Sequence, residues 1–298
     1  MVKAKKTQPK WRLLRQRNSV IDKLPSIWNL LGGAYRTLID NWKIFGAVSL
    51  IYAGLYVFLV RSGSAVNVSE SRELVGELLG SEASGALETF TVAGAVLASA
   101  SQSGEAGQSL YGTLLVIIFS LVQIWMLRRL AAGKKFKLRD AFYRSQTALI
   151  PFILLLLLIT LQLLPFVLGG MLYATVQAQN IAVNAWEGAL FGAIWLGLSA
   201  LSSWWLANSL MAAYAVTLPG MYPLAALKAT AKSIKHRRWA VLGRVLFLLA
   251  AVGVMFLVML LFTVSVLPGL NLWPMDLFGV VVLPFVHAYL YQLYRSLI

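Results

Sequence analysis

The stretch TALIPFILLLLLITLQLLPFVLGGMLYATV, residues 147–176, decides the fold, because it runs for thirty residues without a charged side chain. About 20 apolar residues are enough for a helix to cross a bilayer. Five further apolar segments flank it. The six expected spans are Ile44–Val60, Tyr111–Leu127, Thr147–Val176, Ala189–Val216, Val241–Leu267 and Leu277–Tyr294. With 59% hydrophobic and 12% charged residues, the chain is predicted to be an all-α polytopic membrane protein with six transmembrane helices.

Lys and Arg are distributed unevenly between the segments that connect these spans. Twenty-four of the 26 lie in Lys3–Lys43, Arg128–Arg144 and Lys228–Arg244 and at Arg295. The intervening segments hold only Arg61 and Arg72, together with eight of the eleven acidic residues. Because basic connections stay in the cytoplasm, both termini are predicted to lie inside. Residues 1–24 would form a basic cytoplasmic tail and 25–298 a single six-span domain, with an outer loop at 61–110.

Short amphipathic segments precede three of the spans. From Ser26 to Asn41 apolar residues recur at helical spacing, which predicts a helix lying in the cytoplasmic interface. The spacing of Ala34, Trp42 and Gly46 before the first span recurs as Ala231, Trp239 and Gly243 before the fifth. Leu138–Ile150 takes the same place before the third span. We therefore expect three hairpins, each consisting of an interfacial helix, an outgoing span and a returning span.

The third and fourth spans differ in character. The third, with its run Leu154–Leu158, is expected to face lipid and to kink at Pro165. The fourth carries small residues at four-residue spacing, such as Gly188 and Gly192, which allow close approach of a neighbouring helix. Substitution of Leu155 by alanine should accordingly matter little.

Few polar side chains lie at apolar depth. Gln162, Asn208 and His287 form a candidate intramembrane polar site, because such residues commonly mark a substrate or proton path. His287 could contact a ligand or proton. Alternatively, it is a neutral side chain packed between helices, bonded to Asn208, Gln162 or a nearby tyrosine.

The sequence lacks the residues that several classes of catalysis and metal binding require. There is no cysteine, and no carboxylate lies at mid-depth in a span. The paired Asp, the Ser with His and the HExxH of intramembrane proteases are missing, as are a phosphate-cradling GxxxxGK[ST] loop and a metal-binding cluster. We therefore expect no catalytic residue, no metal and no cofactor, so that the protein is not an enzyme.

Dense basic runs next to the spans are predicted to bind anionic lipid headgroups. Each Lys or Arg near the surface contributes about 1 kcal/mol of attraction to acidic lipids, and this position favours lipid over nucleic acid. Arg244, one turn past Trp239, is expected to extend its side chain back to the headgroups. The candidate headgroup residues are Lys134, Lys135, Lys137, Arg139, Lys232, Lys235, Arg237, Arg238 and Arg244.

The last third of the chain carries a pattern found elsewhere. Pro223 begins an Ala- and Leu-rich helix that is followed by Ser233, the basic pair Arg237 and Arg238, and Trp239 before a span. This pattern, together with the terminal stretch Tyr291–Leu297, resembles bacterial six-helix inner-membrane proteins related to the non-catalytic membrane domain of glycerophosphodiester phosphodiesterases. The resemblance implies a membrane module without catalytic residues.

Two classes of function remain open from the sequence. The first is a non-enzymatic module of the bacterial inner (plasma) membrane that organises, senses or scaffolds membrane lipids, a protein partner or a second copy of itself. The second is a transporter or channel, favoured by Pro165, Pro284 and the polar residues at depth. A water-filled polar cavity at mid-depth would distinguish the second from the first.

Overall fold

The computed structural model describes residues 24–61, 106–179, 181–182, 184–235, 237–266 and 273–298, and within these ranges no strand occurs. The helices are α1 (Ile27–Asp40), α2 (Trp42–Tyr56) with a π-helical turn at Val57–Arg61, α5 (Ala106–Ala131), α6 (Leu138–Ser145) with a 3₁₀ turn at Gln146–Ala148, α7 (Leu149–Ala178), α8 (Ala185–Ala215), α9 (Pro223–Ile234), α10 (Arg238–Val266) and α11 (Trp273–Leu297). Six of the described helices are long and apolar enough to cross a membrane, so the predicted all-α, six-span class is confirmed. The basic tail, up to residue 23, and residues 62–105 of the outer loop lie outside the described ranges. The inward orientation of both termini stays a prediction.

The elements follow one another in the predicted order of three hairpins. A short helix precedes two long ones in α1–α2–α5, in α6–α7–α8 and in α9–α10–α11. Within each hairpin the outgoing and returning helices pack together. The short helices form where the sequence places an amphipathic segment, and α1 is capped by Ser26, whose hydroxyl accepts a hydrogen bond from the Asn29 N–H at 3.2 Å.

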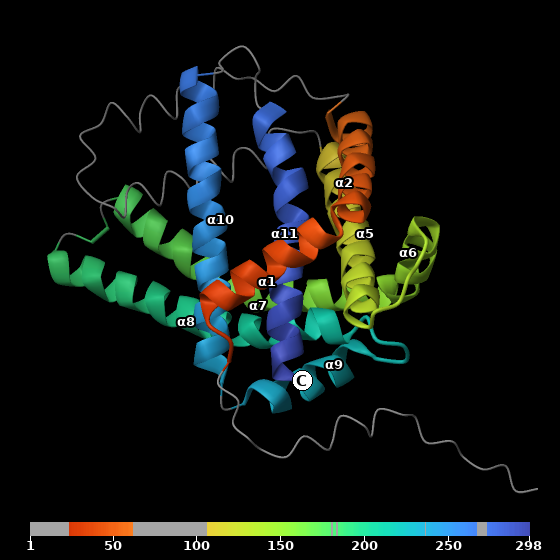
Figure 1. Cartoon of the computed structure of the whole chain (residues 1–298). Coiled ribbons are helices and arrows are strands. Elements are labelled where there is room, and N and C mark those ends of the chain that lie inside the picture. The colour runs from red at the N-terminus through yellow and green to blue at the C-terminus, as the bar shows by residue number, and fades with distance from the viewer. Residues whose placement is uncertain (1–23, 62–105, 180, 183, 236, 267–272) are drawn as a thin grey trace, which may run out of the picture.

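Contacts between the hairpins follow a cyclic order. Each short helix packs on the returning helix of the hairpin before it: α6 on α5, α9 on α8 and, closing the cycle, α1 on α11 (Figure 1). Each returning helix also touches the next outgoing one, in the pairs α5–α7, α8–α10 and α11–α2. We call this arrangement the ring of hairpins. It places α1, the first described helix, against α11, the last one, which serves as its support.

Two of the three short-helix contacts use the same pair of chemical groups. The Gln292 side-chain amide on α11 donates to the Thr37 hydroxyl on α1 at 3.2 Å. The Thr230 hydroxyl on α9 donates to the Asn208 side-chain carbonyl on α8 at 2.9 Å. Hydrogen bonds of this kind fix which faces of two helices meet where apolar packing alone is permissive.

The core lies where the three returning helices converge. Continuous runs of buried residues occur at Phe119–Ile124 of α5, Met211–Val216 at the end of α8 and His287–Leu290 of α11. A helix that is buried on all sides must be surrounded by other helices. The returning helices therefore form the inside of the ring, near the end that carries the basic residues.

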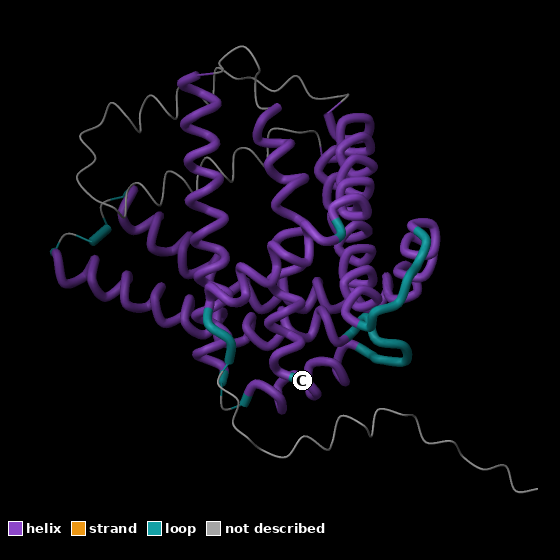
Figure 2. Tube along the Cα trace, viewed as in Figure 1, coloured by secondary structure: helices purple, strands orange, loops and turns teal. Residues whose placement is uncertain are grey.

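Helices α7 and α8 lie across the direction of α2, α5, α10 and α11 (Figure 1), and the tube in Figure 2 shows their outer halves extending away from the other four. Only the inner halves of this pair reach the core. Leu155 of α7 is fully buried there, whereas Leu157 is 66% exposed. The prediction that this span faces lipid throughout is therefore wrong for Leu155, because one face of its first turns packs inside the ring.

Small residues and a serine join α7 to α8. A Cβ atom on Gly169 would lie 3.0 Å from Leu198, so this glycine is a site of close approach, whereas a Cβ atom on Gly192 would lie at an ordinary contact distance of 3.6 Å from Tyr173. After Pro165 the N–H of Phe166 donates to the Ser202 hydroxyl of α8 at 3.2 Å. A proline frees backbone groups within a membrane helix, and a neighbouring serine is a usual partner for them. Helix α8 does pack along α7, but Gly188 and Gly192 lie at ordinary contact distances, so the close approach expected at these small residues stays a prediction.

Candidate functional site

The three side chains of the predicted intramembrane polar site each bond to a different residue of the protein. Gln162 accepts a hydrogen bond from the Ser209 hydroxyl at 2.6 Å, and Asn208 is paired with Thr230. His287 Nδ1 lies 3.1 Å from the Tyr214 hydroxyl. The α8 helix takes part in all three pairs, and in each it is joined to a different neighbour, α7, α9 or α11. The three hydrogen-bonded pairs therefore fix the position of α8 against these neighbouring helices.

Tyr214 was not among the residues that the sequence pointed to, although it lies at the centre of the core. It is buried, stacks on Tyr294 of α11 with ring centroids 5.8 Å apart, and bonds to His287. A tyrosine near the end of an apolar segment is common in membrane helices as an interfacial anchor. Its central position follows only from the convergence of α5, α8 and α11.

Arg128 was grouped with the basic cytoplasmic cluster by its position in the sequence, and the structure gives it a partly buried site between α5 and α8. Its guanidinium donates to the backbone carbonyls of Thr217 at 2.8 Å and Tyr214 at 3.1 Å, and to the Thr217 hydroxyl. These carbonyls lie at the C-terminus of α8, where a positive charge complements the helix dipole. Arg128 therefore holds the end of one returning helix against another.

Arg244 likewise has protein partners. Its guanidinium donates to the carbonyl oxygens of Pro25, at 2.9 and 3.0 Å, and Leu24, at 3.2 Å, and to Ala240 at 2.7 Å. The Tyr289 hydroxyl donates to the Arg244 carbonyl at 3.2 Å. The side chain thus ties the segment before α1 to α10, and the Arg244 carbonyl links α10 to α11. The headgroup contact expected from the sequence stays a prediction.

The other candidate headgroup residues divide into two environments. Six are exposed: Lys134, Lys135, Lys137, Arg139, Lys232 and Lys235. Arg237 and Arg238 are half-buried, and Arg238 lies over the ring of Trp204 at 5.1 Å from its centroid. Arg139 lies over the exposed Tyr143 at 5.4 Å. The exposed side chains are free to reach lipid phosphates, whereas Arg238 also packs α10 against α8.

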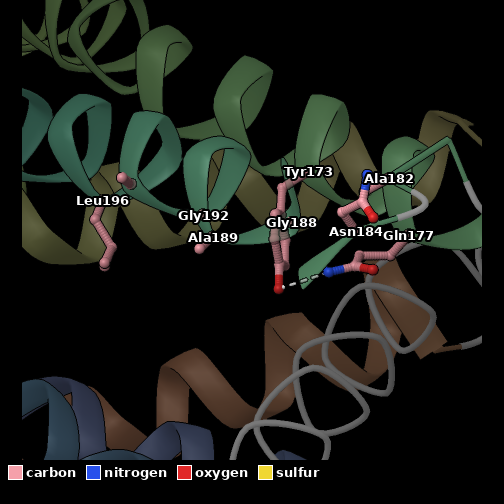
Figure 3. Close-up of a pocket in the computed structure, with 9 residues that line it drawn as sticks. Tyr173, Gln177, Ala182, Asn184, Gly188, Ala189, Gly192 and Leu196 are labelled. Carbon is pink, nitrogen blue, oxygen red and sulfur yellow. Dashed lines mark hydrogen bonds between the residues drawn. The ribbon is translucent and has the colours of Figure 1, made fainter. Parts of the chain in front are cut away.

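One cavity, of about 510 Å³, lies near the outer tip of α7 and α8 (Figure 3). On one side Gln177 donates from its amide to the Tyr173 hydroxyl at 3.0 Å. On the other side Gly188 and Gly192 supply backbone without a side chain, so the hollow results from their missing Cβ substituents. No charged side chain lines it among the described residues, and it offers little for recognising an ion.

A second cavity, of about 430 Å³, lies at the basic end of the ring, and we call it the inner cavity. It opens between the α1–α2 junction and the loop that leaves α5. Its lining residues are Asn41, Ile44, Leu130, Gly133, Lys134, Lys135 and Phe136. Two lysines and an asparagine thus line one hollow together with three apolar residues.

The loop beside the inner cavity is fixed by its sequence. Gly133 has φ of +64°, its N–H donates to Leu130 O at 2.9 Å, and the Lys134 N–H donates to Arg129 O at 3.1 Å. This Schellman motif needs glycine at the left-handed position. Two residues beyond Lys134, Phe136 packs edge-on against Trp125 of α5 at 5.3 Å. Lys134 and Lys135 are therefore held between two anchored residues.

Among the described residues, no three His, Asp or Glu side chains gather closely enough to hold a metal ion. The resemblance to membrane domains of glycerophosphodiester phosphodiesterases stays a prediction. No family model, no curated protein and no solved structure matches the chain.

Proposed function

We propose that the protein is a non-enzymatic membrane module that gathers anionic lipids at the cytoplasmic face of its membrane. The observation that carries the proposal is the ring of hairpins, in which α1, α6 and α9 each pack on a returning helix. Each of these short helices adjoins or contains basic residues. Folding would thus join three separate Lys/Arg segments into one basic surface.

Electrostatics gives this surface a preference for acidic lipids. The six exposed basic residues around α6 and α9 can approach phosphates without breaking internal hydrogen bonds. Each contributes on the order of 1 kcal/mol of attraction near an anionic surface. Trp28, Trp42 and Trp239 are exposed at the beginnings of α1, α2 and α10, which suits anchoring at headgroup depth.

We also propose which side of the membrane the basic surface faces and which membrane holds the protein. The basic surface faces the cytoplasm if basic connections stay inside, and the inner (plasma) membrane of a bacterium supplies acidic lipid on that side. The apolar outer halves of α7 and α8 face either lipid or another protein chain. A protein partner or a second copy of the chain would co-purify with the protein in mild detergent.

Retention of lipid by the purified protein tests the proposal. The protein, reconstituted in phosphatidylcholine vesicles with phosphatidylglycerol as the minority lipid and extracted in mild detergent, should retain phosphatidylglycerol selectively. Retention should fall as salt is raised, because screening shortens the reach of surface charges to about 8 Å at physiological ionic strength. Replacing Lys137, Arg139, Lys232 and Lys235 together by glutamine should weaken retention. Arg238 is left intact because of its contact with Trp204. Equal retention of both lipids at low salt would contradict the proposal.

The transporter alternative predicts a different result. It would need Gln162, Asn208 and His287 to serve a common path, whereas each has its own partner in the protein. Selective, saturable flux of a solute in proteoliposomes, in the absence of selective lipid retention, would favour that alternative.

A further inference from the structure

We propose that the inner cavity is a discrete binding site for the phosphate of one anionic phospholipid, distinct from the diffuse attraction of the basic surface. The inference rests on the proposed function and deepens it. The two cavities differ in the charge of their lining residues. The outer one has no charged lining residue among those described, whereas the inner one is lined by Lys134 and Lys135.

The two sides of the inner cavity match the two parts of a phospholipid. Lys134 and Lys135 supply ammonium groups for the phosphate, while Ile44, Leu130 and Phe136 supply an apolar wall for the start of the acyl chains. No carboxylate lines the cavity among the described residues. A site with two positive charges and an apolar wall fits a lipid phosphate better than a fully hydrated soluble ion.

The N-terminus of α2 also favours binding of an anion in the inner cavity. Asn41 precedes the first turn of this helix but its side-chain oxygen caps no backbone N–H, while its Nδ2 donates to the Thr37 carbonyl of α1 at 3.0 Å. The N-terminus of α2 therefore has no side-chain acceptor from its cap residue. An anion in the cavity would lie beside this positive end of the helix dipole.

The site is also preorganised. The Schellman motif at Gly133 and the packing of Phe136 on Trp125 fix the loop on both sides of the two lysines. A preformed loop loses less conformational entropy on binding than a mobile one. By contrast, Lys137 and Arg139 belong to the same connection and are exposed, but neither lines the cavity.

This difference provides a matched pair of variants. Lys134→Gln with Lys135→Gln, and Lys137→Gln with Arg139→Gln, each remove two positive charges from one connection. A diffuse surface would respond equally to both. The proposed site predicts that only the first pair loses a tightly held phosphatidylglycerol, by roughly thirty-fold in apparent affinity.

A third variant keeps every charge and fills the space. Ile44→Trp should place a larger side chain in the inner cavity and reduce binding of the same lipid. Ile44→Val, which leaves the cavity open, is its control. Loss of lipid in Ile44→Trp with retention in Ile44→Val would show that the cavity itself is needed.

Native mass spectrometry of the full chain in mild detergent, after extraction from the phosphatidylcholine–phosphatidylglycerol vesicles, counts the lipid. One phosphatidylglycerol should persist at about 0.5 M salt, where the Debye length is roughly 4 Å and the diffuse surface is screened. Equal loss in both charge pairs would overturn the site and leave the proposed function standing. Absence of selective lipid retention in the unaltered protein would instead overturn the proposed function. Displacement of the lipid by millimolar inorganic phosphate would overturn the lipid assignment in favour of a soluble phosphate ligand.

Discussion

Gly33 of α1 lies directly against Gln292 of α11, so closely that a Cβ atom placed on Gly33 would overlap the side-chain amide of Gln292. The same amide donates to Thr37 one turn further along α1. The missing side chain therefore allows the hydrogen bond that closes the ring of hairpins. Gly32, its neighbour in sequence, meets nothing within 4 Å of its own added Cβ.

This pair of glycines gives a direct test of ring closure. Gly33→Leu should displace Gln292 and destabilise the fold by about 1–3 kcal/mol, the usual cost of over-packing. Gly32→Leu should be neutral or stabilising, since leucine is the better helix former. Thermal unfolding in detergent measures the stability, and trypsin cleavage at Arg36 reports whether α1 stays docked. Similar melting of the two variants would mean that α1 does not depend on this contact.

Arg128 should matter far more than its neighbour in sequence. Arg128→Ala removes the donor to the Thr217 carbonyl and one of the two donors to the Tyr214 carbonyl, and we expect a loss of about 2–3 kcal/mol. Arg129 lies over Trp125 at 4.9 Å, and its replacement by alanine should cost about 1 kcal/mol or less. Equilibrium unfolding in mixed detergent compares the two. Equal losses would show that the end of α8 does not need Arg128.

Two leucines of one helix should also respond differently. Leu155→Ala opens a cavity inside the ring and should cost about 2–5 kcal/mol. Leu157→Ala changes a side chain on the outside of α7 and should have little effect. The same unfolding assay compares the loss of stability in the two variants. A larger loss in Leu157→Ala would reverse the assignment of the buried and exposed faces.

The bond between Tyr214 and His287 should be structural. Tyr214→Phe and His287→Gln should each lower the free energy of unfolding by about 1 kcal/mol, and a double-mutant cycle should show that the two effects are coupled. Neither change should alter solute flux. A pH-dependent flux in proteoliposomes that disappears in His287→Ala, with the fold intact, would contradict the non-transport function.

Orientation can be tested because the chain has no cysteine of its own. Single cysteines at Ser81 and Ser101, which lie outside the described residues, should react with an impermeant thiol reagent applied from outside. Cysteines replacing Lys134 and Lys232 should not, because basic connections stay in the cytoplasm. Labelling of the second pair from outside would reverse the proposed topology.

The sequence predicted those parts of the fold that have a strong local signal. Uninterrupted apolar length marked all six long helices, and the helical spacing at α1, together with its recurrence before α10, revealed the hairpin order. It could not assign the faces of the first turns of α7, because the apolar run Leu154–Leu158 has no polar residue to show which side is packed. Leu155 and Leu157 look alike in such a segment and differ only through tertiary contacts.

At the candidate sites, too, the sequence predicted only the residues that have a local signal. Gln162, Asn208 and His287 stand out as polar residues in apolar segments, but their partners Ser209, Thr230 and Tyr214 carry no such signal. The lysines of the inner cavity were found by charge alone. What separates Lys134 and Lys135 from Lys137 is the opposing α1–α2 junction, which is more than 80 residues away in the chain.

The closure of α1 on α11 sets a condition on how the protein is made. Thr37 and Gln292 are 255 positions apart, and a ribosome adds about 5–20 residues per second. The first short helix must therefore wait tens of seconds for its permanent neighbour, lying meanwhile on lipid with its glycine face uncovered. During synthesis α1 would behave as a peripheral membrane peptide, and only the arrival of α11 would convert it into part of the folded domain.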